Sequence, residues 1–201
     1  MAYRIIQGVG INDAGYVVNK TDSLGRRVRC PFYVKWAAML ERCYSESFHK
    51  TNPSYIGCSV HPNWHRFSNF KAWMEQQDWE GKHLDKDLLI INNRIYSPET
   101  CVFVSGAVNN FTLDGGNQKS GLPMGVSLDK SYVPLMYKAQ CRSVISGKNE
   151  TVGRSPNPYI AHKAWLAAKL EQAYILAAQQ TDERVAKALI DRYENYKEYF
   201  G

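Results

Sequence analysis

An eight-residue stretch near the middle of the chain, DGGNQKSG at 114–121, most limits the folds that this sequence can adopt. It holds three glycines and no large apolar side chain, a composition typical of a linker. The segments on either side, 1–113 and 122–201, are each long enough to bury a small hydrophobic core. We therefore predict two domains joined by a glycine-rich linker at 114–121.

The composition favours folded domains without a membrane anchor. Of the 201 residues, 44% are hydrophobic and 12% are aromatic, which is more buriable surface than disordered chains carry. No run approaches the roughly 18 consecutive apolar residues of a membrane span, and the start lacks the basic-then-apolar order of a secretory signal. We expect no membrane partner and a cytoplasmic location. The five cysteines lack CxxC spacing, which predicts free thiols.

The charge of the chain is positive and unevenly distributed. Lysine and arginine total 25 against 19 acidic residues, a net charge of +6. Within 119–169, eight basic residues stand against two acids, whereas 82–118 holds three bases and four acids. A basic segment after a nearly neutral one predicts a polyanionic partner for the second domain and a separate task for the first.

Hydrophobic periodicity predicts an α+β fold. Apolar residues recur at helical spacing in 33–44 and 67–74, and a short β-like run follows at 83–90. The second domain shows three short strands within 125–155, then a long helix and a final helix from about 182 to 199. The predicted apolar faces are Trp36, Met39, Leu40 and Cys43; Phe67, Phe70, Trp73 and Met74; and Leu166, Leu170, Ala173, Tyr174 and Ala177.

Carboxylate and amide side chains gather in the segment 83–110. Asp85 and Asp87 are two residues apart, so on a strand they point to the same side, and Asn92 and Asn93 follow in a turn. Hydrolysis of a phosphodiester needs an oxygen-liganded cation to hold the phosphate and a base to activate water. The segment therefore predicts a Mg²⁺ site.

The order of elements in 83–110 resembles the ββα-metal core of HNH endonucleases of the phage homing type. A strand with an aspartate, an Asn-Asn-Arg turn and a Pro-Glu-x-x segment follow one another as in that core. The aromatic run at 64–73 resembles the segment that precedes it. The resemblance spans about residues 33–110, and it implies hydrolysis of double-stranded DNA with Mg²⁺ or Mn²⁺ as cofactor.

The resemblance assigns roles to individual residues. Asp85 matches the metal-binding acid, Lys86 stands where the family has its general-base histidine, and Asn93 lies near the central asparagine of the catalytic loop. A lysine acts as a base only if its pKa falls by several units, so His83, Lys86 and no competent base stay open as alternatives. The further candidate metal ligands are Asp87, Thr100, which stands where the family has an asparagine, and in its place Asn109 or Asn110.

A structural Zn²⁺ site is an alternative that the spacing does not favour. Five potential ligands lie within 23 residues, but their spacing, C-x5-H-x8-C-x2-H followed by another histidine, is not that of a zinc finger. Cys43 also falls on a predicted apolar stripe, where a packed thiol is the simpler explanation. The five residues are Cys43, His49, Cys58, His61 and His65.

The second domain resembles the DNA-binding domain of the plant Apetala and ethylene-response type, which also occurs attached to HNH homing endonucleases. A Gly-Val start, an aromatic-basic-Ala strand and a glycine before an Ala-rich helix carry the resemblance, and Tyr137 stands where the family has a tryptophan. The family implies that the sheet enters the major groove. The residues expected to contact DNA are Lys130, Lys138, Arg142, Lys148 and Arg154.

Together these features predict a metal-dependent DNA endonuclease of HNH homing type. The alternative is a catalytically inactive DNA-binding, regulatory or inhibitory protein on the same scaffold, because the family's histidine and second asparagine are replaced here. Salt-sensitive DNA binding without cleavage distinguishes the second reading from the first.

Overall fold

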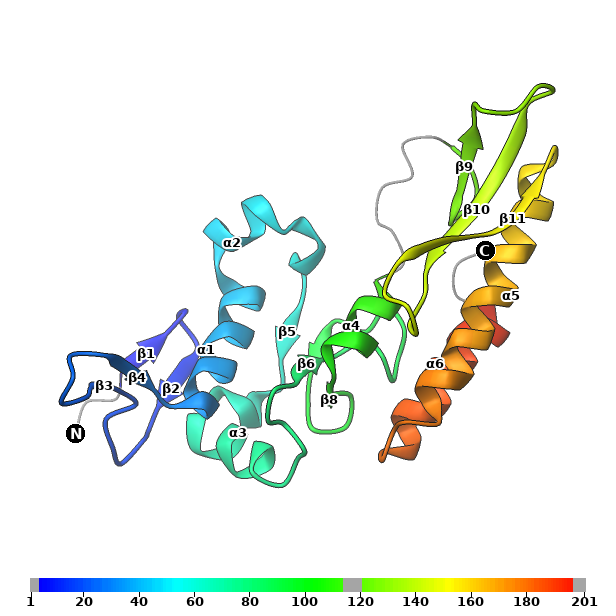
Figure 1. Ribbon diagram of the computed structural model, residues 1–201. Helices are drawn as coiled ribbons and strands as arrows, with labels where there is room; N and C mark the ends of the chain where they lie inside the picture. Colours follow the sequence, from blue (N-terminus) through cyan, green and yellow to red (C-terminus); the bar gives the residue numbers. More distant parts are fainter. Residues whose placement is uncertain (1–3, 114–120, 197–201) are drawn as a thin grey trace. The chain divides into compact units, whose positions relative to one another are not determined.

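The computed structural model describes residues 4–113 and 121–196, and its contacts divide the chain into two compact units, Met1–Val104 and Ser105–Gly201 (Figure 1). This division falls upstream of the predicted linker at 114–121, of which 114–120 lie outside the described residues. Helix α4 (Gly106–Thr112) accounts for the difference, because its last carbonyls accept hydrogen bonds from side chains of the two C-terminal helices. The segment therefore belongs to the second unit.

The first unit consists of short helices and two-stranded sheets. Hairpins β1–β2 and β3–β4 are antiparallel, β5 pairs with β7 in parallel, and β6 pairs with β8 in antiparallel register. The bounds are β1 Arg4–Ile6, β2 Gly10–Asn12, β3 Asn19–Thr21, β4 Arg27–Arg29, α1 Pro31–Tyr44, α2 Glu46–Thr51, β5 Ser59–Val60, α3 Phe67–Met74, β6 His83–Asp85, β7 Ile95–Tyr96 and β8 Val102–Val104, with 3-10 turns at Pro53–Tyr55 and Pro62–His65.

Helices α1 and α3 form the core of the first unit. Trp36 is fully buried, and its indole Nε1 donates to the carbonyl of Trp64 at 2.7 Å, so the polar atom of this large side chain is satisfied inside the core. The periodicity prediction is confirmed for all four positions in α1 and for three in α3, while Trp73 is only partly buried.

The second unit is a three-stranded antiparallel sheet packed against a long helix. The strand order is β11-β10-β9, and the bounds are β9 Val126–Asp129, β10 Met136–Arg142, β11 Asn149–Ser155, α5 Pro158–Ala177 and α6 Glu183–Glu194. Strand β11 lies close to α5: a Cβ added at Gly153 would stand 2.5 Å from the Cβ of Ala164. The chain is thus α+β, as predicted, and the three strands are confirmed.

The buried face of α5 agrees with the predicted one at Ala173 and Ala177 and differs from it elsewhere. Trp165 and Lys169 are buried, whereas Tyr174 is 49% exposed. The Lys169 ammonium donates to the carbonyl of Phe111 at 2.6 Å and lies 3.8 Å from the centre of that ring. A buried lysine is stable here because it caps the C-terminus of α4 and contacts aromatic faces. Hydrophobicity alone assigns this position to the surface.

No helix within 4–113 and 121–196 combines the length and the apolar character needed to cross a membrane.

Candidate nucleic-acid interface

One face of the three-stranded sheet carries basic side chains. Along β10 the side chains alternate, so Ala139 and Cys141, both buried, point toward α5, and Lys138 and Arg142 point the other way. Arg154 of β11 pairs directly with Lys138 and therefore shares its face. Three of the five predicted DNA contacts thus stand on the surface that α5 leaves uncovered.

The two remaining predicted contacts lie at opposite ends of the sheet. Lys130 follows the last residue of β9, and Lys148 precedes the first residue of β11. Both side chains are exposed. Since the β9–β10 and β10–β11 turns are at opposite ends of β10, these lysines extend the basic face along the strand direction.

An acidic residue interrupts the basic face. Asp129 accepts hydrogen bonds from the Ser131 hydroxyl at 2.5 Å and from Arg154 at 3.1 Å. These bonds, the serine first and the arginine second, hold the pKa of Asp129 below its ordinary value. Arg154 also lies 5.4 Å from the centre of the Tyr132 ring. Sequence reasoning missed both partners, because register across the sheet decides which acid meets which base.

Tyr137, placed by the resemblance at the family's tryptophan, is on the opposite side. It pairs with Leu128 and Ser155, next to the buried Ala139, so alternation turns it toward the face that α5 packs against. The basic face therefore consists of Lys138, Arg142 and Arg154, and the Tyr137 ring is not part of it.

In the first unit, the predicted acidic strand is shorter than expected. Strand β6 ends at Asp85, and the Asp85 Oδ1 atom accepts the backbone N–H groups of Asp87 at 2.9 Å and Leu88 at 2.7 Å. The chain therefore turns directly after Asp85, and the expected β-like run at 83–90 is confirmed only for 83–85. A side chain that caps its own turn competes with continuation of the strand.

Lys86 is buried and ion-paired. Its residue is 8% exposed, and the ammonium donates to Asp87 Oδ2 at 2.7 Å and to the carbonyl of Asn93 at 3.1 Å. The rings of Tyr55 and Tyr96 lie about 6 Å away. Burial acts to lower the pKa of Lys86, but the hydrogen bond and charge of Asp87 outweigh it and raise the pKa. The group is therefore a fixed cation at neutral pH.

Asn93 and Thr100 hold the loop that follows β6. The Asn93 amide donates to the carbonyls of Lys86 at 2.6 Å and Ile95 at 2.7 Å, and the Thr100 hydroxyl donates to Ile95 at 2.8 Å. Both side chains thus bond to backbone groups of the loop. Asn109, in α4, belongs to the second unit.

Asp85 and His83 lie on the same strand, where Asp85 is half-buried and His83 is exposed. The pKa of Asp85 is raised, first by burial and then by the nearby charge of Asp87. Its Oδ2 atom has no hydrogen bond. Within residues 4–113 and 121–196, every fully buried side-chain polar atom has a hydrogen-bond partner, so this oxygen reaches solvent. His83 is exposed and two residues earlier on the same strand.

The donor set falls short of a complete metal site. Two carboxylates, Asp85 and Asp87, are close enough to affect each other, but the Lys86 ammonium already balances Asp87. Within the described parts of the chain, no three His, Cys, Asp or Glu side chains are grouped to hold a metal ion. The zinc candidates have other surroundings: Cys43 and Cys58 are buried thiols, while His49 and His65 bond to backbone carbonyls and His61 accepts the N–H of Asn63.

No protein-family model, no curated protein and no solved structure matches this chain.

Proposed function

We propose that this chain is a double-stranded DNA-binding protein that contacts the duplex through the uncovered face of the β9–β11 sheet. The observation that carries the proposal is the shared orientation of Lys138, Arg142 and Arg154 on the side opposite α5. A β-sheet face of this kind fits the major groove, whose width admits a two-stranded ribbon. Lys130 and Lys148 at the two ends add cations for flanking phosphates.

Binding of a duplex of about 20 base pairs at several salt concentrations tests this proposal. Each neutralised phosphate contributes about 0.9 to the slope of log K against log salt. Lys138 and Arg142, the two cations of the sheet face that Asp129 does not neutralise, therefore predict a slope of about −1.8 or steeper. A duplex that stays unbound at about 50 mM salt contradicts the proposal.

Replacing Asp129 with asparagine is expected to tighten duplex binding by several-fold. Asparagine keeps the Oδ1 acceptor for Ser131 but removes the negative charge that neutralises Arg154. A freed guanidinium contributes one further phosphate contact, which steepens the salt slope by about 0.9. Fluorescence anisotropy with a labelled duplex measures both changes, and a weaker complex at every salt concentration would show that Arg154 does not reach the phosphates.

Cleavage of the bound DNA by the first unit is a second candidate function. It is favoured by one observation: His83 and the solvent-reaching Oδ2 of Asp85 lie on the same face of β6. The strand-loop-strand order of 83–104, with Asn93 bonded across the loop, supports it. In this candidate an exposed imidazole takes the proton of the attacking water, while the paired Lys86 ammonium positions the loop.

Nicking of supercoiled plasmid in the presence of Mg²⁺ or Mn²⁺ tests the second candidate. If it holds, His83→Ala slows nicking by roughly 10²–10⁴-fold, the usual contribution of a general base, and Asp85→Asn abolishes it. Lys86→Arg, which keeps the cation, retains most of the activity. A wild-type protein that binds plasmid and leaves it intact rejects cleavage and leaves the binding proposal standing.

A further inference from the structure

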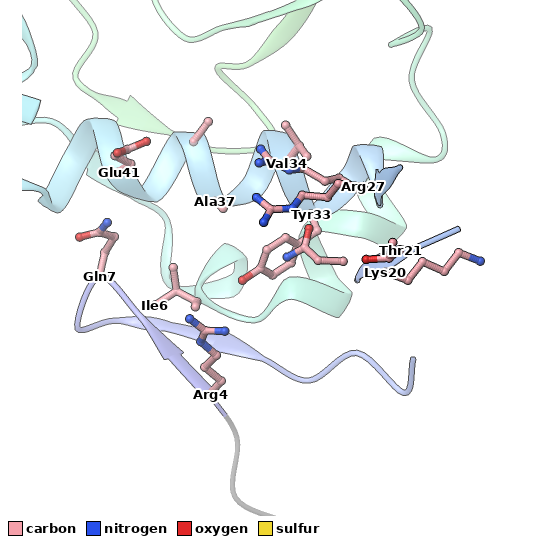
Figure 2. Close-up of a pocket in the computed structure, with 13 residues that line it drawn as sticks. Arg4, Ile6, Gln7, Lys20, Thr21, Arg27, Tyr33, Val34, Ala37 and Glu41 are labelled. Carbon is pink, nitrogen blue, oxygen red and sulfur yellow. The ribbon is translucent and has the colours of Figure 1, made fainter. Parts of the chain in front are cut away.

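A large concave pocket lies in the first unit, between the two N-terminal hairpins and helix α1 (Figure 2). Its volume is about 840 Å³, within the range of about 300–1,000 Å³ typical of small-molecule sites. Side chains of β1, β3, β4 and one face of α1 line it. None of the residues predicted to act in catalysis or DNA binding is among them.

Unpaired cations form one part of the pocket wall. Arg27 and Arg29 are two residues apart on β4 and pair with Thr21 and Asn19, so their side chains share the face that lines the cavity. Arg4 reaches the same cavity from β1. Among the residues that the structure describes, 4–113 and 121–196, none of these three guanidinium groups has a hydrogen bond or an ion pair. Three arginines that line one cavity without a counter-ion favour an anionic ligand.

The floor of the pocket is apolar and aromatic. Tyr33, Val34 and Ala37 come from α1, and Ile6 comes from β1. Figure 2 shows Arg4 and Arg27 approaching Tyr33 from opposite sides. The Tyr33 hydroxyl makes no hydrogen bond, and it is not among the buried atoms, so it faces the cavity. The Tyr33 ring itself is buried and packs against Trp36 and Phe67, so a ligand here meets the hydroxyl edge of Tyr33 and the aliphatic side chains of the floor, next to positive charge.

The beginning of α1 adds to the preference for an anion. Its N-cap residue, Cys30, makes no side-chain hydrogen bond to the first turn, so the free N–H groups of that turn leave a partial positive charge beside Arg29. Glu41, the acid on the pocket wall, lies further along α1, and Figure 2 shows it beside Gln7, away from Arg27. The β4 end of the cavity, with Arg27 and Arg29, is therefore cationic, and Glu41 and Gln7 lie away from it.

We infer that this pocket binds a nucleotide unit, with its phosphate on Arg27 and Arg29, which share one face of β4, and its base on the apolar floor beside Tyr33, where Arg4 adds positive charge from β1. An isolated phosphate uses only the arginines, and an intact duplex hides its bases from a concave site. A nucleotide supplies both a negative charge and a flat ring, which together match the two halves of the cavity. The site is separate from the sheet face of the second unit and does not depend on it.

Two sources of the nucleotide unit are distinguished by the probes. The full chain is titrated with a free deoxynucleoside triphosphate, with a single-stranded oligothymidylate of about ten nucleotides, and with inorganic phosphate, all at about 0.1 M salt. Tighter binding of the single strand identifies an unpaired DNA segment as the source, whereas tighter binding of the triphosphate identifies a free nucleotide. Inorganic phosphate is expected to bind at least tenfold more weakly than either.

The Arg27→Ala, Arg29→Ala double variant is expected to weaken nucleotide or single-strand binding at least tenfold. Both side chains are exposed and unpaired, so their loss leaves the fold in place. Lys50→Ala, which removes an exposed cation of α2 outside the pocket, is the matched control. Thermal unfolding of each variant checks that the fold is kept.

The sheet variants separate this site from the duplex interface. Lys138→Ala with Arg142→Ala should leave the nucleotide affinity unchanged, and the pocket variant should leave duplex affinity unchanged. The inference is overturned if wild-type protein binds neither probe, if Lys50→Ala weakens binding as much as the pocket variant, or if the sheet variant abolishes nucleotide binding. It is also overturned if inorganic phosphate binds as tightly as the nucleotide, since the floor then contributes nothing.

Discussion

Replacing both Lys138 and Arg142 with alanine is expected to weaken binding of double-stranded DNA by about 60-fold at 0.1 M salt. Each phosphate contact contributes a factor of about eight at this concentration, because the salt dependence per contact has an exponent of about 0.9. The two side chains lie two residues apart on β10, on the face opposite α5. Arg142 is exposed and Lys138 is half-buried, so truncation removes charge without opening the core.

The salt slope is the diagnostic measurement for this variant. It should fall by about 1.8 relative to the wild type, in anisotropy titrations of one labelled duplex. Lys163→Ala, which removes an exposed cation from α5, leaves the slope almost unchanged if only the sheet face contacts DNA. Equal losses in Lys163→Ala and in the sheet variant would instead indicate a diffuse electrostatic attraction of the whole basic unit.

Local sequence patterns predicted the parts of this fold whose periodicity is set by one buried face. The α1 stripe of Trp36, Met39, Leu40 and Cys43 is fully inside the core, and the three strands of the second unit occur where short apolar runs alternate with turns. The shared face of Lys138 and Arg142 also follows from period-two alternation. These features need no knowledge of the partner element.

Features that depend on long-range pairing were not predictable. The resemblance placed Lys86 at the general-base position, but the loop folds so that its ammonium bonds to Asp87 and to the Asn93 carbonyl. The pocket beside α1 unites arginines from β1 and β4, which are 23 to 25 residues apart along the chain. The aspartate that pairs with Arg154 is likewise set by strand register. The spacing of residues along the chain predicts none of these contacts.

Replacing Gly125 with alanine is expected to destabilise the second unit by about 2–5 kcal/mol. Its φ is +75°, a conformation that costs an L-residue about 1–2 kcal/mol. A Cβ there would also stand 2.1 Å from the Cδ1 atom of Trp165, and overpacking of this kind adds about 1–3 kcal/mol. Trp165 has little room to move, because it stacks on His162 and meets Tyr193 and Tyr196 at 6.3 and 5.8 Å between ring centres.

Hydrogen exchange locates this effect, because the carbonyl of Gly125 accepts the backbone N–H of Gln140 in the central strand at 2.9 Å. Protection of that amide should fall by roughly a thousandfold for about 4 kcal/mol, if it exchanges through unfolding of the unit. Gly147→Ala is the matched control: its φ is +67°, but its added Cβ meets only Arg142 at 3.9 Å. It should therefore show the backbone penalty alone, about 1–2 kcal/mol. Equal losses of protection in the two variants would mean that Trp165 moves aside, and that contact between β9 and α5 is looser than the geometry indicates.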